Sequence, residues 1–455
     1  MKKGKLSGNR KEMMLNDPIE QVIPHLAVPT IISMLITTIY NMADTYFVSK
    51  IGTSASGSVG IIFSAMAMIQ AVAFTIGVGS GTNVSQCLGA GDEKKARTFV
   101  ATGFTTAFLT GTLISVLALT HLEWLVRFLG ATETIAPYAI DYGTYIFFAT
   151  PFQMCALGMN NMLRFEGLAA YSMWGIATGG ILNMALDPLF IFGFHMGTAG
   201  AALATGLSQF ISFSILLCIT MFNKQAISID FRCVRPTKAI LGRILYNGFP
   251  SMGRQGLASV ATIVLNNAAG IYGDAAIAAF SIVNRFIMFI NSTVVGFGQG
   301  FQPVCGFCYG AGRYTRVRHA YWFCVKVTTC ILLVLGITSF LAAGPIVQFF
   351  RDDPEVVRIG TVLLRFHLLT IPLWGFITMS NMFSQSIGYG VRATLISASR
   401  QGFCLIPLLL ILPQFMGLTG LQICQPCADV LSFIFAFVIV NRIQQQMAAM
   451  PDHLD

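Results

Sequence analysis

The sequence predicts an all-α polytopic membrane protein, with twelve transmembrane helices in two parallel six-helix lobes related by pseudo-two-fold symmetry about the membrane normal. Three observations support this fold class: the composition, twelve long apolar segments, and an internal repeat that relates the two halves of the chain. Of the 455 residues, 55% are hydrophobic and only 10% are charged. A soluble protein carries about 25% charged residues, so this chain lacks the polar side chains that a water-facing surface requires.

Twelve segments are long and apolar enough to cross a bilayer, which requires about 20 mainly apolar residues. In chain order they are 22–48, 57–83, 97–120, 135–160, 168–192, 197–221, 241–270, 276–302, 318–342, 357–383, 393–414 and 417–441. The connections between them are short, which leaves no room for a folded soluble domain. We therefore expect five parts: an N-terminal tail (1–21), an N-lobe (22–221), a linker (222–240), a C-lobe (241–442) and a C-terminal tail (443–455).

The basic residues predict which ends of the spans face the cytoplasm. With the N-terminus inside, 20 of the 28 Lys and Arg residues fall on cytoplasmic segments and four fall on outer segments. Cytoplasmic loops carry such an excess, so we expect both termini in the cytoplasm. The net charge of +9 then indicates orientation in a membrane and not a nucleic-acid surface.

An internal repeat relates the two halves of the chain. An offset of 221 in residue number aligns Gly and Pro positions in particular: Pro29 with Pro250, Gly89-Ala90-Gly91 with Gly310-Ala311-Gly312, and Asn160 with Asn381. An offset of 220 continues the alignment, with Gly197 and Gly200 onto Gly417 and Gly420. Each half holds six spans, an even number, so both halves insert in the same orientation. Parallel repeats of this kind occur in transporters, which bind substrate where the repeats meet.

Acidic residues inside the membrane are the first candidates for function. A carboxylate at mid-bilayer costs about 2.5–3.5 kcal/mol, and only Asp44, Asp187 and Asp429 lie clearly within spans. Asp44 and Asp187 lie at similar depth near outer span ends, Asn183 shares the helix face of Asp187, and Thr205 lies at comparable depth. Such oxygens suit Na⁺, and two carboxylates equally suit one shared proton. Interfacial acids wetted by headgroups are the structural alternative.

The second half lacks this carboxylate pair, because it carries Leu at both aligned positions. It contains Arg254, Gln255 and Arg285 instead. These residues are expected either to line a cavity of the C-lobe or to form a structural pairing within the membrane, for example with Asp429.

Further candidate ligand contacts lie on the helix that carries Asp44. Met34, Thr37 and Tyr40 follow one another at every third position, and a flexible thioether beside an aromatic ring suits promiscuous binding. Plain helix packing is the alternative interpretation. Pro29 is expected to bend this helix, because proline removes a backbone hydrogen bond, and such a bend would move Asp44.

Other motifs do not indicate a catalytic site. Two C-x-x-C pairs, at 305–308 and 424–427, lie at membrane depth without a βαβ context, so we interpret them as chance spacing among 11 cysteines. The chain contains no G-x-x-x-x-G-K-[ST] motif, which excludes nucleotide hydrolysis by a P-loop. We therefore expect no enzyme activity and no resident cofactor or metal, and an ion gradient as the source of energy.

Several motifs resemble those of the multidrug and toxic compound extrusion (MATE) family. They are Tyr40-Asn41-Met42-Ala43-Asp44, Gly89-Ala90-Gly91, Leu163-Arg164-Phe165-Glu166-Gly167, Asn183-Met184-Ala185-Leu186-Asp187-Pro188, Gly197-Thr198-Ala199-Gly200-Ala201-Ala202 and Gln299-Gly300-Phe301-Gln302-Pro303. The resemblance covers nearly the whole chain, and Asn160 also fits the family pattern, which implies that it contacts substrate.

The resemblance implies a multidrug efflux transporter in the bacterial cell membrane. Such a protein exports amphipathic, often cationic compounds by antiport with H⁺ or Na⁺, alternates access between two lobes, and requires no partner protein. The seventh span lacks the acidic residue of one Na⁺-coupled branch and carries Arg254-Gln255 instead, which resembles the DNA-damage-inducible branch. A lipid-linked saccharide flippase of the same superfamily is the alternative function.

Overall fold

The computed structural model describes the backbone of residues 3–452, and within these residues the chain is built from helices without strands. The first half contains α1 (Lys3–Asn16), α2 (Ile19–Ser49), α3 (Thr53–Gly89), α4 (Glu93–Thr120), α5 (Leu122–Phe128), α6 (Ala136–Phe165), α7 (Ala169–Pro188) and α8 (Gly197–Phe222). The second half contains α9 (Lys238–Gly270), α10 (Asp274–Gly310), α11 (Tyr314–Leu341), α12 (Ala343–Phe350), α13 (Pro354–Ser386), α14 (Gly390–Ala398) and α15 (Leu405–Ala448). Two π-helical stretches, η1 (Leu189–Gly193) and η3 (Ser399–Phe403), and a 3₁₀ turn, η2 (Phe231–Cys233), complete the secondary structure.

The helices account for the twelve spans that the sequence predicts. In the described part of the chain, nine helical stretches are long and apolar enough to cross a membrane. Helices α6 and α9, of 30 and 33 residues, are additional to these nine. The last stretch, Gly390–Ala448, contains two spans, because the chain turns at Gly417 with φ 59°. Glycine allows this positive φ without a steric cost.

Some helix ends differ from the prediction. Helices α3 and α10 continue to Gly89 and Gly310, beyond the predicted ends at 83 and 302, and α6 continues to Phe165. Hydropathy marks only the part of a helix that crosses hydrocarbon, so it misses turns that continue against other protein segments. Helices α1, α5 and α12 were not predicted for a related reason, since they are too short to register as spans.

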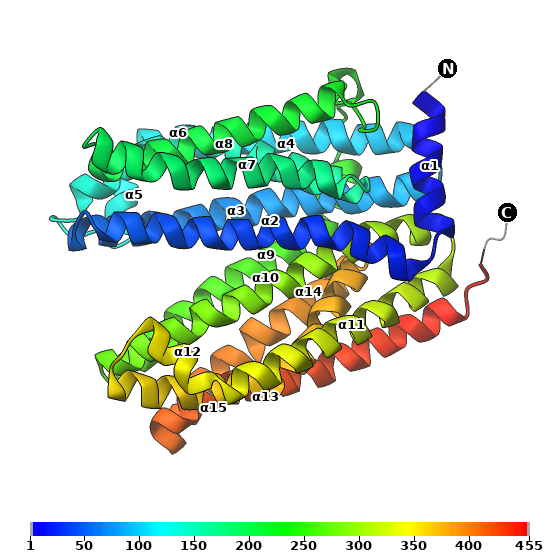
Figure 1. The fold of residues 1–455 in the computed structure, drawn as a ribbon. Helices are drawn as coiled ribbons and strands as arrows, with labels where there is room; N and C mark the ends of the chain where they lie inside the picture. Colours follow the sequence, from blue (N-terminus) through cyan, green and yellow to red (C-terminus); the bar gives the residue numbers. More distant parts are fainter. Residues whose placement is uncertain (1–2, 453–455) are drawn as a thin grey trace.

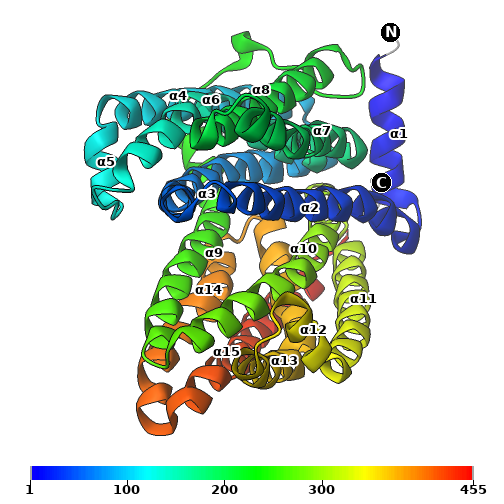
Figure 2. The same cartoon turned by 60° about the vertical axis from the view of Figure 1, so that its left-hand side comes forward.

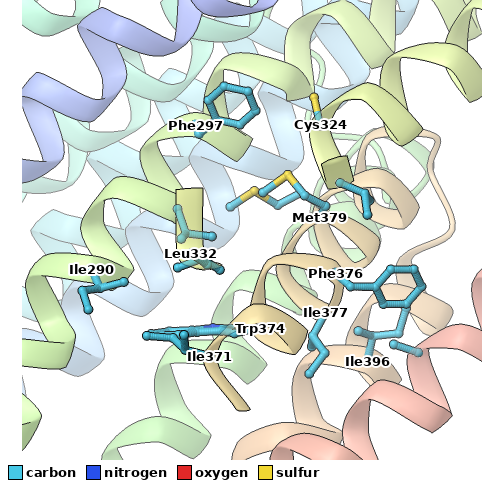
Figure 3. Close-up of a cluster of buried hydrophobic side chains, with 14 of the residues drawn as sticks. Ile290, Phe297, Cys324, Leu332, Ile371, Trp374, Phe376, Ile377, Met379 and Ile396 are labelled. Carbon is cyan, nitrogen blue, oxygen red and sulfur yellow. The ribbon is translucent and has the colours of Figure 1, made fainter. Parts of the chain in front are cut away.

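The helices form two lobes that lie side by side in both views (Figures 1 and 2). Helices α2–α8 form the N-lobe and α9–α15 form the C-lobe, and the packing between lobes is mainly that of α2 and α3 against α9 and α10. The lobes meet toward the end where both termini lie, here called the terminal end, and diverge toward the opposite end (Figure 1). The described residues form two hydrophobic clusters. One lies mainly in the N-lobe, and the other joins the C-lobe to the end of α1 and the start of α2. Figure 3 shows part of the C-lobe core, in which Trp374 lies beside Ile371.

Glycines allow the two lobes to touch at the terminal end. A methyl group built on Gly89 would lie 2.1 Å from the carbonyl oxygen of Phe307, and one built on Gly310 would lie 2.0 Å from that of Gln86. Both contacts are related by the internal repeat, since Gly89 corresponds to Gly310 and Gln86 corresponds to Phe307. The crossing of α3 and α10 therefore follows the pseudo-two-fold symmetry, with backbone packed on backbone.

The repeat also preserves side-chain contacts within each lobe. Asn160 Nδ2 donates a hydrogen bond to the carbonyl of Ser172 at 2.9 Å, and Asn381 Nδ2 donates to the carbonyl of Ala393 at 2.7 Å. Donor and acceptor are both displaced by the offset that aligns Pro29 with Pro250. These two bonds place the same helix pairs in the same relation in both lobes.

The end of helix α1 connects the lobes at the terminal end. Arg10 donates to the backbone carbonyl of Glu166 in the N-lobe at 3.1 Å, and Arg316 of the C-lobe donates to the carbonyl of Met14 at 3.2 Å. Burial raises the pKa of Glu166 to about 8, against the opposing effects of the Ile227 backbone N–H and of Arg10. The segment predicted as a tail thus contains a packed helix.

Candidate functional site

The predicted ion-coupling residues on α7 and α8 form one hydrogen-bonded group. Asn183 Nδ2 donates to Asp187 Oδ1 at 3.3 Å and to Thr205 Oγ1 at 3.2 Å. Asn183 and Asp187 are one helical turn apart, which places them on the same face of α7. Asp187 is fully buried and Asn183 and Thr205 are nearly so. The structure thus brings these three predicted residues together, and their role in ion coupling stays a prediction.

Asp44 reaches the same site from α2. It lines a cavity of about 310 Å³ together with Tyr40, Tyr142, Thr205 and Gln209, among others. The Asp44 and Asp187 carboxylates are close enough to interact electrostatically. Two acids from different helices therefore lie near the ends where the lobes diverge. The sequence predicts the same location, since it places both acids at similar depth near the outer ends of their spans.

Three buried oxygens of this group have no hydrogen-bond donor in the described part of the chain. They are Asp44 Oδ1, Asn183 Oδ1 and Asp187 Oδ2. Leaving a buried acceptor unpaired costs about 1–3 kcal/mol, and more for a charged one, so such groups are seldom found without a functional reason. Carboxylate and amide oxygens are ligands of hard cations, and a proton on either carboxylate would supply a donor. The site is chemically suited to take up H⁺ or Na⁺.

The predicted ligand contacts line a second, adjoining cavity of about 50 Å³ in the N-lobe. Met34, Thr37, Tyr40 and Asn160 all border it, together with Asn183 and Thr205. Tyr40 and Thr205 border both cavities. Ligand pockets commonly measure about 300–1,000 Å³, so the larger cavity beside Asp44 has the size of a small-molecule site, whereas the smaller one holds little more than water.

Asn160 lies inside α6 because this helix is longer than predicted. The segment after residue 160 is too polar to register as a span, and Arg164 within it is buried and donates to Gln299 of the C-lobe at 2.8 Å. The sequence prediction missed Gln153, which also lines the smaller cavity, and Gln209, which lines both. Gln209 follows Thr205 by one helical turn, so the spacing itself was a usable signal.

The predicted C-lobe residues lie apart from these cavities. Arg254 Nη1 donates to Asn381 Oδ1 at 3.4 Å, and Arg285 is exposed. The predicted pairing of these residues with Asp429 is wrong, since Asp429 pairs with Arg400, whose Nε lies 2.7 Å from Asp429 Oδ1. The prediction counted Arg400 on the cytoplasmic side although it lies within the predicted span 393–414. The structure places it inside the C-lobe, where it pairs with Asp429.

Pro29 lies inside α2, which remains helical across it. The next residue, Thr30, donates its hydroxyl to the carbonyl of Gly296 on α10 at 2.6 Å, so this part of α2 is packed against the C-lobe. The bend at Pro29 stays a prediction.

Two helical lobes that place buried carboxylates beside a cavity of small-molecule size define a multi-pass membrane transporter. The MatE family model matches residues 29–189 and 250–411, which is more than half of the chain. The second match begins at Pro250, the position that the internal repeat aligns with the start of the first match at Pro29. The chain therefore belongs to the MATE family.

Relatives and solved structures are similar over nearly the full length. The multidrug export protein MepA of Staphylococcus haemolyticus is 28% identical, covering 95% of this chain and 96% of the relative. MepA of Staphylococcus aureus strain MSSA476 is 27% identical, covering 94% and 95%.

Among solved structures, a MATE transporter crystallised in complex with MaL6 has a TM-score of 0.91 at 25% identity, covering 96% of this chain and 99% of that one. An outward-facing MATE family transporter of the MOP superfamily has a TM-score of 0.90 at 25% identity, covering 96% and 98%.

Proposed function

We propose that this protein is a secondary active multidrug efflux transporter, which exports amphipathic, often cationic compounds in exchange for H⁺ or Na⁺. The observation that carries the proposal is the set of buried, unpaired oxygens of Asp44, Asn183 and Asp187 beside a cavity of about 310 Å³ in the described part of the chain. A cationic compound and the coupling ion would neutralise the same carboxylates. Their binding is then mutually exclusive, which is the condition for antiport.

The arrangement of the lobes supports alternating access. The lobes are packed together at the terminal end and diverge at the other (Figure 1), and the basic residues assign the terminal end to the cytoplasm. Removing Arg400 from the cytoplasmic count leaves 19 basic residues on that side against four outside, so the bias persists. In this form the lobes therefore open toward the outside of the bacterial cell, and both termini lie on the cytoplasmic side of its membrane.

An ion gradient is sufficient to drive this exchange. One charge that crosses the membrane gains about 2.3 kcal/mol per 100 mV, and the sequence has no P-loop. The proposed cycle requires neither a resident cofactor nor a partner protein. Uptake of the ion at Asp44 and Asp187 would release the compound outward, and a bend of α2 at Pro29 would transmit this change.

The lipid-linked saccharide flippase is the weaker alternative. A diphosphate-linked substrate calls for a ring of free arginines in the central cavity. In the described part of the chain, Arg254 is engaged by Asn381 and Arg164 by Gln299. The MepA relatives also carry names of multidrug exporters.

The test is ethidium efflux from proteoliposomes with an imposed pH or Na⁺ gradient. Asp44→Asn and Asp187→Asn should each lower gradient-driven efflux by at least about tenfold, or about 1.4 kcal/mol, because Asn has no negative charge for the ion to neutralise. Asp141→Asn is the matched control, since Asp141 is exposed on α6 and its loss should leave efflux unchanged.

Unchanged gradient-driven efflux in both Asp44→Asn and Asp187→Asn would refute the coupling site. Efflux that responds to ATP and to neither gradient would refute the transporter class. The gradient that drives the wild type identifies the coupling ion.

A further inference from the structure

A second buried polar group lies in the C-lobe around Arg400 and Asp429, here called the C-lobe cluster. Asp429 Oδ1 accepts hydrogen bonds from Arg400 Nε at 2.7 Å and from Gln425 Nε2 at 3.0 Å. Its Oδ2 accepts from the Thr370 hydroxyl at 3.2 Å. Asp429 therefore has donors on both oxygens, unlike the acids of the N-lobe site, and has little capacity left for a coupling ion.

The arginine of the cluster is not saturated. A guanidinium has five N–H donors, and the Nε–H is the one that Asp429 occupies. The four N–H groups on Nη1 and Nη2 have no acceptor in the part of the chain that the structure describes. The Arg400 side chain is 15% exposed, against 3% for Asp429, so it remains accessible. A free guanidinium edge binds a carboxylate through two parallel hydrogen bonds.

An aromatic ring lies directly against this guanidinium. The Arg400 carbon Cζ is 4.1 Å from the centroid of the Trp374 ring, a stacking distance. Trp374 lies on α13 beside Ile371, at the edge of the hydrophobic cluster in Figure 3. Trp374 is itself buried, with 6% of its surface exposed, so its indole holds the guanidinium in place. The cluster thus offers a fixed cation to a molecule that carries an anionic group.

The internal repeat places the cluster opposite the N-lobe cavity. Arg400 corresponds to Gly179 and Trp374 to Gln153 at an offset of 221, and Asp429 corresponds to Gln209 at an offset of 220. These three N-lobe residues all line the smaller cavity described above. Because the lobes share one scaffold, the C-lobe cluster occupies the position that holds the smaller cavity in the N-lobe.

The local backbone is also unusual at this point. Arg400 lies in the π-helical stretch η3, between α14 and α15. Single-turn π-helical stretches occur frequently at functional sites, because the extra residue redirects a side chain. A purely structural ion pair would need neither this distortion nor an open guanidinium edge, and a buried pair adds little stability over apolar packing.

We propose that the C-lobe cluster is a substrate subsite that binds the carboxylate of zwitterionic compounds, with Arg400 as the anion contact and with Asp429 and Trp374 as the residues that hold its guanidinium in place. This inference rests on the proposed efflux function and assigns to Arg400 a role in selecting its substrates. The cationic group of such a compound would face the acids of the N-lobe. The two lobes then recognise opposite charges of one molecule across the space between them.

The test uses two fluorescent dyes that differ in one group. Rhodamine 110 carries a free carboxylate, and rhodamine 123 is its methyl ester. The double variant Arg400→Gln/Asp429→Asn removes both charges and leaves no lone buried charge behind. It should export rhodamine 123 at the wild-type rate and should raise the KM for rhodamine 110 by at least about tenfold, the loss of about 1.4 kcal/mol. Arg365→Gln, an exposed arginine of the same lobe, is the control and should export both dyes normally.

Several results would overturn the proposal. The first is that the double variant exports both dyes as well as the wild type does. The second is that export of both dyes falls equally in a double variant whose melting temperature is that of the wild type. The third is that the wild type exports only rhodamine 123. If wild-type vesicles export neither dye and no ethidium, the proposed function itself fails. Binding of the two dyes to the purified protein in detergent then decides about the subsite: tighter binding of rhodamine 110 that the double variant abolishes supports it, and equal binding refutes it.

Discussion

The contact between Gly310 and Gln86 provides a direct test of how the lobes close at the terminal end. Gly310→Ala adds a single methyl group, which would lie 2.0 Å from the carbonyl oxygen of Gln86. An ordinary contact requires at least 3.4 Å, so α3 and α10 would have to move apart until the methyl group and this oxygen reach that separation. The obstacle is backbone, which has no rotamer to change.

The energetic effect follows from packing data. Extra methyl groups in a packed interface cost about 1–3 kcal/mol, and this cost applies only to the form in which the terminal end is closed. At about 1.4 kcal/mol per tenfold change, we expect a shift of roughly 5- to 150-fold away from the closed form. Gly256→Ala is the control, because nothing lies within 4 Å of a methyl group on Gly256 in α9.

The assay is a spin-label distance between the lobes. Labels at positions 94 and 315, both exposed at the terminal end on α4 and α11, are introduced into a cysteine-free background that retains wild-type efflux. Gly310→Ala should show a second, longer distance that Gly256→Ala lacks. A distance distribution in Gly310→Ala identical to that of the parent would refute the reasoning, since the closed contact would then tolerate the methyl group.

Three further predictions concern individual polar contacts. Burial raises the pKa of Glu166 from 4.5 to about 8, so its contribution to stability is complete below pH 4.5 and is lost as the pH rises through 8. Glu166→Gln should therefore flatten the fall in melting temperature between about pH 5 and 8, and an unchanged fall would contradict the assignment. Arg164→Met breaks the bond to Gln299 between the lobes, and a double-mutant cycle with Gln299→Leu should give a coupling in unfolding free energy of about 1 kcal/mol, whereas additive effects would show that the bond is inert. Thr205→Val removes the hydroxyl that Asn183 contacts and should weaken the ion dependence of efflux several-fold, with melting temperature as the control for folding; an unchanged ion dependence would exclude Thr205 from the site.

Local spacing along the chain was sufficient to predict much of the candidate site. Asn183 and Asp187 are four positions apart, and the helical period alone places them on one face, where the structure shows them bonded. The cost of a buried charge identified Asp44 as well, because few acids lie inside the spans. The missed cavity residues Gln153 and Gln209 are neutral, and a neutral side chain gives no comparable signal against an apolar background.

The membrane class, the twelve spans and the two-fold repeat were determined by the sequence alone, since hydropathy and glycine positions are local properties that repeat along the chain. Only the tertiary structure decided three other features. They are the closure of α3 on α10, the packing of α1 across both lobes, and the pairing of Arg400 with Asp429. Each of these joins segments that lie far apart along the chain, as Arg316 and Met14 do. No hydropathy window or helical period relates such segments, because their partners are selected by the packing of whole helices.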